Sequence, residues 1–200
     1  MNTIATATRV ELWRCASCLD GVTIADDFGA IVASSRLGAT MRSNLEVGGF
    51  IVAALRGDVL VGYATTVPLA ALSSPEAAPF DRWHDLPDGY ELGAIEVARA
   101  ARRAGIATAL MRRLGQHDEL ERAIVLAHGT ASHWDVDDAG LGYFRYRAML
   151  IRVLSRAGFE PRATDDPETR DSAANFLAVR IGRAAPKPSV ATMEERLFRR

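Results

Sequence analysis

Residues 90–111, which read YELGAIEVARAARRAGIATALM, constrain the fold more than any other stretch of the chain. Leu92–Val97 are apolar apart from Glu96 and follow an Asp-Gly turn dipeptide, a pattern typical of a buried strand. From Thr108 to Leu120, apolar residues recur between charged ones at helical spacing. A short basic turn over 102–107 joins the two segments. The chain therefore places a strand, a glycine-containing turn and a helix in direct succession.

The turn before this helix has the chemistry of an anion site. The first N–H groups of a helix have no partner inside it, and the helix dipole adds partial positive charge there, so a phosphate can dock on that end. Gly105 lets the backbone approach a ligand without a Cβ in the way, and Ala107 is nearly as small. Arg102 and Arg103 add fixed positive charge and forked donors.

The length and charge of the chain narrow the classes of protein to consider. Its 200 residues suit one domain with short extensions, and a net charge of −1 gives no broad electrostatic case for nucleic acid. No apolar run approaches the length that spans a bilayer, and the N-terminus lacks the basic start and long apolar core of a secretory signal. We therefore expect a cytoplasmic protein with neither a nucleic-acid nor a membrane partner.

The two cysteines, Cys15 and Cys18, form a C-x-x-C pair. Such a pair can be a redox centre or half of a zinc site. A zinc site would need a second pair of ligands, no second cysteine pair exists, and no thioredoxin-like βαβ pattern surrounds the first. Two reduced structural thiols and no metal site are the expectation.

The remaining pattern predicts one mixed α/β domain over residues 1–183, followed by a C-terminal tail over 184–200. Pro186 and Pro188 interrupt the pattern, so the tail is expected to be loosely held or to dock as an arm on a second subunit of a homodimer. Residues 72–87 contain three prolines and are expected to form a loop in which Phe80, Trp83 and His84 cover an apolar surface. Strands are expected near 10–13, 22–24, 49–55, 59–67, 92–97, 123–127 and 175–181, and helices near 28–32, 37–45, 108–120 and 143–157.

The turn motif carries a resemblance to a known family. Arg102-x-x-Gly105-x-Ala107 after a strand resembles the pyrophosphate loop, Q/R-x-x-G-x-G/A, of the GNAT superfamily of N-acetyltransferases. From about Phe50 to Gly182 the chain also looks like one branch of that superfamily, the acetoin-utilisation protein acetyltransferases. The segments that carry this narrower likeness are Tyr90–Val97, His133-Trp134-Asp135, Tyr146-Arg147-x-Met149-Leu150, Thr164–Glu168 and Ala174-Asn175.

The resemblance implies a fold, a cosubstrate and an acceptor. The fold would be a mixed, mostly antiparallel sheet with helices on both faces, in which two central strands part to admit the thioester arm of acetyl-CoA. The acceptor would be a protein lysine, on an acyl- or acetyl-CoA synthetase that acetylation inactivates. The coenzyme-binding residues that it implies are Ile95, Glu96, Val97, Arg102, Arg103, Ala104, Gly105, Ile106, Ala107 and Thr108.

Three rival functions stay open from the sequence. One is a small-molecule amine acetyltransferase of the same fold, and another is a non-catalytic regulator that binds acyl-CoA. The third is a nucleotide-binding α/β protein, which the absence of G-x-G-x-x-G disfavours.

Acetyl transfer to an amine needs a base, because a lysine with a pKa near ~10.4 is neutral in roughly one molecule in a thousand at pH 7. Two carboxylates are candidates. Glu91 lies eleven residues before Arg102, and Glu96 lies closer to the thioester position. Alternation along a strand should point them to opposite faces unless a bulge intervenes. Either could instead form a salt bridge with a neighbouring arginine; we favour Glu96 slightly.

The acid is less clearly marked. Leu154 stands where many members of the superfamily have a tyrosine, so Tyr146 is the candidate acid, with Tyr143 or solvent as alternatives. A simple packing role is the other interpretation of Tyr146. His133, two residues before Asp135, is expected to shape the acceptor site or fix its loop, and is a further candidate base.

An acidic cluster of Asp165, Asp166 and Glu168 surrounds Pro167. It is either a capped turn or an attraction for a basic, lysine-bearing surface.

Overall fold

The computed structural model describes residues 7–29, 31–72 and 82–198. Within them, eight strands form one sheet in the order β1-β3-β4-β5-β6-β8-β7, with β2 paired to β4 beside this path. Paired strands are antiparallel except for β5 with β6 and β2 with β4. The strands are β1 (Thr8–Trp13), β2 (Thr23–Ile24), β3 (Phe50–Arg56), β4 (Val59–Pro68), β5 (Gly89–Val97), β6 (Ile124–Gly129), β7 (Glu160–Arg162) and β8 (Phe176–Ile181).

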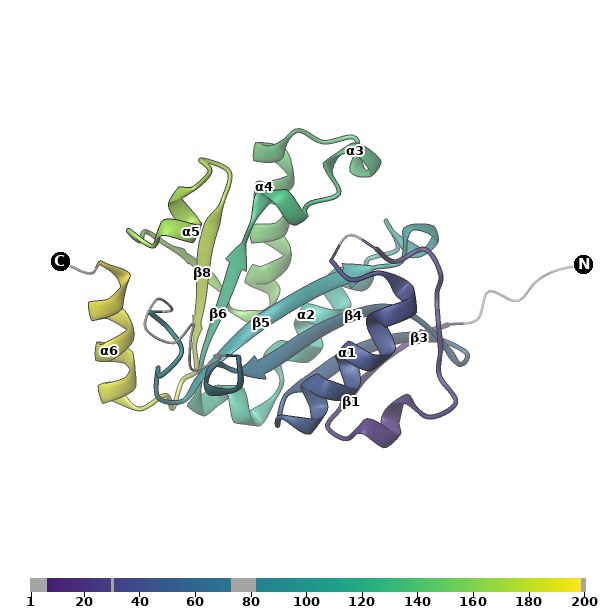
Figure 1. The fold of residues 1–200 in the computed structure, drawn as a ribbon, viewed down its shortest axis with the longest axis horizontal. Helices are drawn as coiled ribbons and strands as arrows, with labels where there is room; N and C mark the ends of the chain where they lie inside the picture. Colours follow the sequence, from purple (N-terminus) through teal and green to yellow (C-terminus); the bar gives the residue numbers. More distant parts are fainter. Residues whose placement is uncertain (1–6, 30, 73–81, 199–200) are drawn as a thin grey trace, which may run out of the picture.

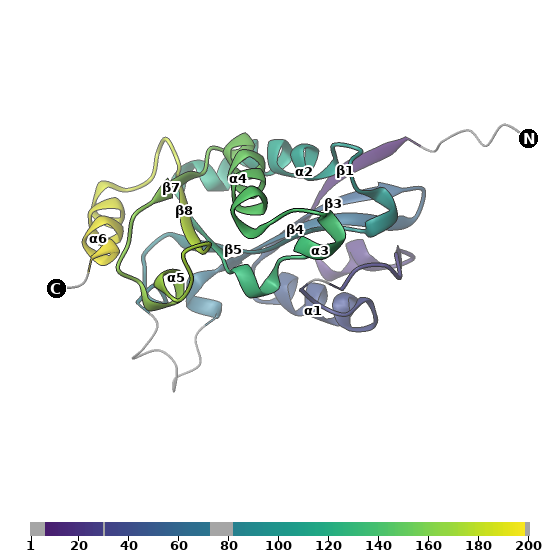
Figure 2. The same cartoon turned by 90° about the horizontal axis from the view of Figure 1, so that it is seen from above.

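Helices cover both faces of this sheet (Figures 1 and 2). The helices are α1 (Ser34–Glu46), α2 (Ile106–Gly115), α3 (Val136–Ala139), α4 (Tyr143–Leu154), α5 (Pro167–Arg170) and α6 (Lys187–Leu197). Helices α2 and α4 lie on one face, and α1 and α5 lie on the other. The mixed, mostly antiparallel architecture expected from the sequence is confirmed.

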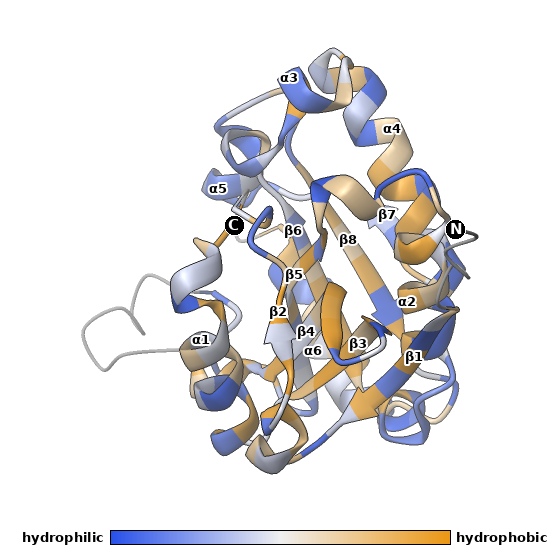
Figure 3. Ribbon diagram, turned by 90° about the vertical axis from the view of Figure 1, so that its right-hand side faces the viewer, coloured by the Kyte–Doolittle hydropathy of each residue, from blue (hydrophilic) through white to orange (hydrophobic). Residues whose placement is uncertain are grey.

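The helices are held by apolar faces at helical spacing. Leu37, Met41 and Leu45 are buried at four-residue intervals on α1, and Leu110 and Leu114 repeat that spacing on α2. Figure 3 shows the hydrophobic residues of the strands enclosed between α1 on one side and α2 and α4 on the other. The centres of β3 and β4 are buried on both faces, because helices cover the two sides.

The C-terminal segment differs from the loose tail expected. Residues 187–197 form α6, and its Met193 is only 1% exposed. It packs into a second core with Leu69, Trp83 and Leu86, on the α5 side of β6 and β8. The segment is thus a helix docked on its own chain rather than a loose tail, while the division of the chain at residue 183 stays a prediction.

Two further expectations concern loops. Residues 28–32 were expected to be helical, but the described part of that segment is irregular with bends at 31 and 32, and the first α-helix begins at Ser34. Trp83 is buried and packs as expected, whereas Phe80 lies outside the described residues. Along the described ranges, no helix combines the length and apolar character needed to cross a membrane.

Candidate active site

The site begins where two parallel strands part. Strands β5 and β6 pair only through Gly89–Ile124, Tyr90–Val125 and Glu91–Leu126. Beyond these pairs, β5 continues to Val97 against β4, and β6 continues to Gly129 against β8. A wedge-shaped gap therefore opens between the carboxyl ends of β5 and β6, as the resemblance implies (Figure 1).

A bulge in β5 decides which side chains share a face. Thr65 is opposite Ala94 and Thr66 is opposite Leu92, so Gly93 is the extra residue. Beyond it Tyr63 faces Glu96, and before it Val67 faces Glu91. Tyr63 and Val67 are four residues apart on one strand and share a face, so Glu91 and Glu96 do as well. The exception allowed for in the sequence, a bulge that cancels their alternation, is the case found.

This shared face is the one that α1 covers. Tyr63 packs edge-on against Phe28, with ring centroids 5.4 Å apart. A Cβ on the next residue, Gly62, would instead meet the side chains of Ile106 and Leu110 in α2. The two glutamates therefore lie on the opposite side of the sheet from α2.

A cavity of about 770 Å³ occupies the gap. Nine of the ten predicted coenzyme-binding residues line it; Ala104 is the exception. Among the candidate catalytic residues, Glu96, His133 and Tyr146 line it, whereas Glu91 does not. The sequence therefore identified most of one wall of the cavity.

The turn before α2 is built as a close backbone approach. Gly105 is the N-cap in the left-handed region with φ 77°, and Arg103 is left-handed as well, with φ 65°. The first intrahelical bond of this turn runs from the Ala109 N–H to the Gly105 carbonyl. The N–H groups from Ile106 to Thr108 therefore precede the helical ladder at the cavity wall, the position that binds phosphates.

The Arg102 side chain is engaged by neighbouring groups of the fold. Its Nε donates to the Val97 carbonyl at 3.2 Å, and its guanidinium pairs with Asp135 at 2.9 Å and with Asp138. The side chain thus ties the turn to the α3 loop, whereas the neighbouring Arg103 is exposed. Burial would raise the pKa of Asp135, but Arg102 and then Arg99 outweigh it and hold that pKa below its usual range.

The His133-Trp134-Asp135 segment holds the far rim of the cavity. Asp135 fixes the loop through Arg102, and Trp134 stacks on Tyr146 with centroids 5.4 Å apart and planes at 18°. His133 is exposed at the cavity mouth. Burial raises the pKa of the Tyr146 phenol, which keeps that group protonated. Leu154 is buried in the same wall and has no proton to give.

Glu96 is a buried carboxylate with both oxygens engaged. The Tyr63 hydroxyl donates to Oε2 at 2.8 Å, and the Gly29 N–H donates to Oε1 at 2.9 Å. Burial, followed by the charge of Glu96, raises the pKa of Tyr63 far above its usual range, so the phenol stays a donor. Glu96 thus fastens the segment before α1 to the sheet.

His128 is a cavity residue that the sequence analysis missed. It lies on β6 two residues beyond Leu126, which is opposite Glu91, so it shares the face of the two glutamates. Its Nδ1 is 3.7 Å from Glu91 Oε1. Its sequence signal was weak, since only strand alternation after 123–127 would have placed it on this face.

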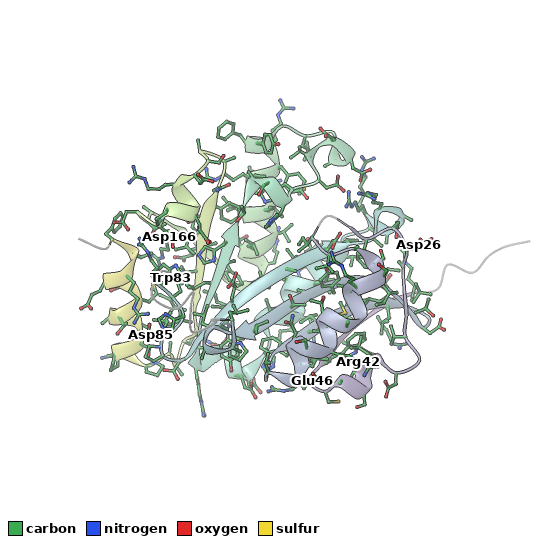
Figure 4. The ribbon with its side chains drawn as sticks, in the orientation of Figure 1. Asp26, Arg42, Glu46, Trp83, Asp85 and Asp166 are labelled. Carbon is green, nitrogen blue, oxygen red and sulfur yellow. The ribbon has the colours of Figure 1, made fainter. Side chains whose placement is uncertain are left out.

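The acidic cluster is a capped and paired turn. Asp166 caps α5 by accepting from the Glu168 N–H at 3.1 Å, and the Trp83 indole donates to it at 2.8 Å (Figure 4). Asp165 pairs with Arg82 at 2.6 Å. These contacts join α5 to the segment before β5 and to α6, so the cluster is part of the packing.

Comparison with known proteins decides the family. The profile of the acetyltransferase (GNAT) family matches residues 25–133. The chain belongs to this family. Two relatives, both named Acetoin utilization protein AcuA, are 30% identical to the acetyltransferase. The one from Bacillus licheniformis aligns over 78% of this chain and 71% of its own length, and the one from Bacillus subtilis over 75% and 69%.

Solved structures agree with the fold of this acetyltransferase. An acetoin utilization protein from Exiguobacterium sibiricum superposes with a TM-score of 0.84 at 22% identity, covering 96% of this chain and 95% of the other. A GNAT-family structure from Desulfovibrio desulfuricans gives 0.53 at 18% identity, covering 86% and 96%. An aminoglycoside acetyltransferase solved with coenzyme A gives 0.50 at 15% identity, covering 89% and 96%.

The acetyltransferase is an acetyl-CoA-dependent N-acetyltransferase. Acetyl-CoA is its cosubstrate, and the chain carries two features that fit this molecule. A left-handed glycine opens α2 at the cavity wall, and the parted strands leave a gap beside it.

Proposed function

We propose that this acetyltransferase moves the acetyl group of acetyl-CoA to a lysine side chain of a protein, and that this protein is an acyl- or acetyl-CoA synthetase inactivated by the modification. The observation that carries the proposal is one cavity that is lined from both faces of the sheet. Residues of the α2 turn line it from one side, and Glu96 of β5 lines it from the other. A cosubstrate and an acceptor amine can therefore approach the gap from different sides.

The rim of the cavity carries exposed apolar side chains, which suit a macromolecule better than a small polar amine. Ile31 is 39% exposed and Met149 37%, and both line the cavity. Tyr143 and Phe144, at the start of the same helix as Met149, are 50% and 65% exposed. Exposed apolar side chains gathered near a cavity mark interaction surfaces. The likeness to the AcuA proteins, one of them 30% identical over 158 residues, supports acetoin utilisation as the setting.

The roles we assign to the cosubstrate-binding residues follow the geometry. The pyrophosphate is held by N–H groups of the turn from Ala104 to Thr108, and the thioester lies in the gap beside Ile95–Val97. Backbone N–H groups of that segment polarise the thioester carbonyl as charge builds on its oxygen. Tyr146, protonated at neutral pH, returns a proton to the departing thiolate. A carboxylate of β5, Glu96 or Glu91, supports removal of the proton from the amine.

The acceptor is tested with labelled acetyl-CoA and purified protein. The arms are an acyl-CoA synthetase, the same synthetase with its active-site lysine replaced by arginine, a panel of small amines, and no acceptor. We expect label on the intact synthetase, none on the lysine variant, and a parallel loss of synthetase activity. Faster turnover of a small amine than of any protein lysine would refute the protein acceptor and leave the N-acetyltransferase activity in place.

A further inference from the structure

His128 is a titratable group of the cavity wall to which the proposed function gives no role. It lies near the end of β6, just past the point where β6 leaves β5. Its side chain is 14% exposed and lines the cavity. Its Nε2 is buried, and no described residue forms a hydrogen bond with it. A buried polar nitrogen without a partner is uncommon in a folded protein and points to a missing partner, such as a substrate.

The other ring nitrogen faces a carboxylate. Nδ1 lies 3.7 Å from Glu91 Oε1, close enough for charge attraction and slightly long for a hydrogen bond. A carboxylate at this nitrogen favours the tautomer with the proton on Nδ1, which leaves Nε2 as the acceptor. Glu91 itself does not line the cavity. The His128 imidazole therefore lies between the cavity, which its Nε2 faces, and the Glu91 carboxylate behind it.

The charges around the imidazole come from two elements. Glu91 of β5 is the nearest, and Asp166 and Glu168 of α5 add negative charge from the same face. Burial alone would lower the pKa of His128, but these carboxylates outweigh it and hold the pKa above its usual value. A base is most effective when its pKa is near the working pH.

Glu96 is less suited to the same task. Each of its oxygens already accepts a hydrogen bond, from Tyr63 and from the Gly29 N–H. Protonating Glu96 would weaken both bonds and loosen the segment before α1. Its position on the same face as His128 makes it a wall of the acceptor site.

We propose that His128 is the catalytic base of this acetyltransferase and that Glu91 is a positioning residue that holds its imidazole with Nε2 toward the acceptor. The proposal rests on the proposed function, because it concerns the amine accepted there. Nε2 takes a proton from the acceptor ammonium, and the neutral nitrogen attacks the thioester carbonyl carbon. The new C–N bond forms as the C–S bond breaks, and the sulfur leaves as a thiolate. Tyr146 gives its proton to the thiolate and is reprotonated by the second proton lost from the nitrogen, so the thiol and the amide both end neutral. His128 returns its proton to solvent.

The test combines kinetics with direct titration of the ring. The variants are His128→Gln, Glu91→Gln and Glu96→Gln, with His84→Gln as the matched histidine control because His84 lies outside the cavity wall. We expect His128→Gln to lower kcat/KM by about a hundred- to ten-thousand-fold, with acetyl-CoA Kd within twofold of wild type. Glu91→Gln should move the acid limb of the kcat/KM profile to lower pH, because the charge that raises the His128 pKa is gone. If Glu91 had a purely structural role, the Glu91→Gln variant would keep the acid limb of the kcat/KM profile at its wild-type pH.

Nitrogen-15 NMR of the four histidines supplies a readout independent of transfer. His128, assigned from the spectrum of its glutamine variant, should titrate with a pKa above the usual histidine value, and that pKa should fall in Glu91→Gln. A His128→Gln variant within threefold of wild-type kcat/KM overturns the proposal. If that variant does not fold, the Glu91→Gln profile decides: an unmoved acid limb overturns it as well.

Failure of the proposed function is distinguishable from failure of this inference. Wild-type protein that acetylates no acceptor, protein or small amine, refutes the proposed function. The NMR titration then tests the inference by itself. A His128 signal that shifts when acetyl-CoA binds and that also responds to Glu91→Gln supports a pairing of His128 and Glu91 at the cavity. A signal unchanged by both refutes it.

Discussion

Replacing Met193 with alanine measures how far α6 belongs to the fold. Met193 is 1% exposed and packs between Trp83, Leu86 and the strands β6 and β8. Polar contacts hold the same helix, among them Ser189 to Asp88 at 2.8 Å and Arg196 to Asp85 at 2.6 Å. The substitution removes only the apolar contribution and leaves these contacts in place.

The loss of stability expected for Met193→Ala follows from the full burial of this side chain in a helix at the edge of the fold. Truncating a buried large side chain to alanine costs about 2–5 kcal/mol, the higher values applying where the surroundings cannot relax. A terminal helix can move into part of the cavity, so we expect about 2–3 kcal/mol. For a domain of this size, each kcal/mol lowers Tm by about 2–4 °C, which gives a fall of about 4–12 °C.

Urea and thermal unfolding followed by circular dichroism measure this loss. Met193→Leu, which nearly conserves volume, should cost less than about 1.5 kcal/mol. The exposed Glu194→Ala on the same helix should change little. Acetyl-CoA Kd should stay unchanged in all three, since no described residue of α6 lines the cavity. A Met193→Ala protein that unfolds like wild type would show that α6 is not docked in solution.

Three further predictions concern the site and its support. Gly105→Glu places a side chain on a left-handed residue and negative charge at the expected phosphate position, so calorimetry should show at least a tenfold loss of acetyl-CoA affinity; unchanged affinity would contradict the loop assignment. Tyr63→Phe removes the donor to buried Glu96 and should cost about 1–3 kcal/mol in urea unfolding, whereas an unaltered midpoint would show that Glu96 finds another donor. Arg183, with Arg180, lowers the pKa of Glu121 to about 2, below its unfolded value near ~4.3, so the pair stabilises the fold above that value and loses this effect as pH falls toward 2. Glu121→Gln should therefore lower Tm at pH 7 and converge with wild type near pH 2; a difference independent of pH would exclude this linkage.

The sequence predicted the strand, turn and helix around Gly105 because each rests on local pattern. The ion pairs between residues far apart in the chain did not follow from local pattern. Arg102 was assigned to a phosphate, but in the fold it meets Asp135 and Asp138 of a loop more than thirty residues away. His128 escaped notice for the same reason, since its partner lies on a different strand.

Two segments show where local rules need context. Pro186 and Pro188 suggested a break, yet they are the N-cap and second residue of α6, where a missing N–H costs nothing. The faces of Glu91 and Glu96 depended on a single extra residue, Gly93, which alternation alone could not reveal.

The three residue pairs that join β5 to β6 also divide the molecule mechanically. On one side of this short seam lie β1 to β5, and on the other lie β6, β8 and β7 with α5. Few interstrand hydrogen bonds need to break for the two halves to separate locally, so the seam is a natural boundary between cooperative opening units. A ligand in the gap would contact both halves and hold them together across the boundary. With acetyl-CoA in the gap, as we propose, the free energy of opening should rise with the concentration of the cosubstrate.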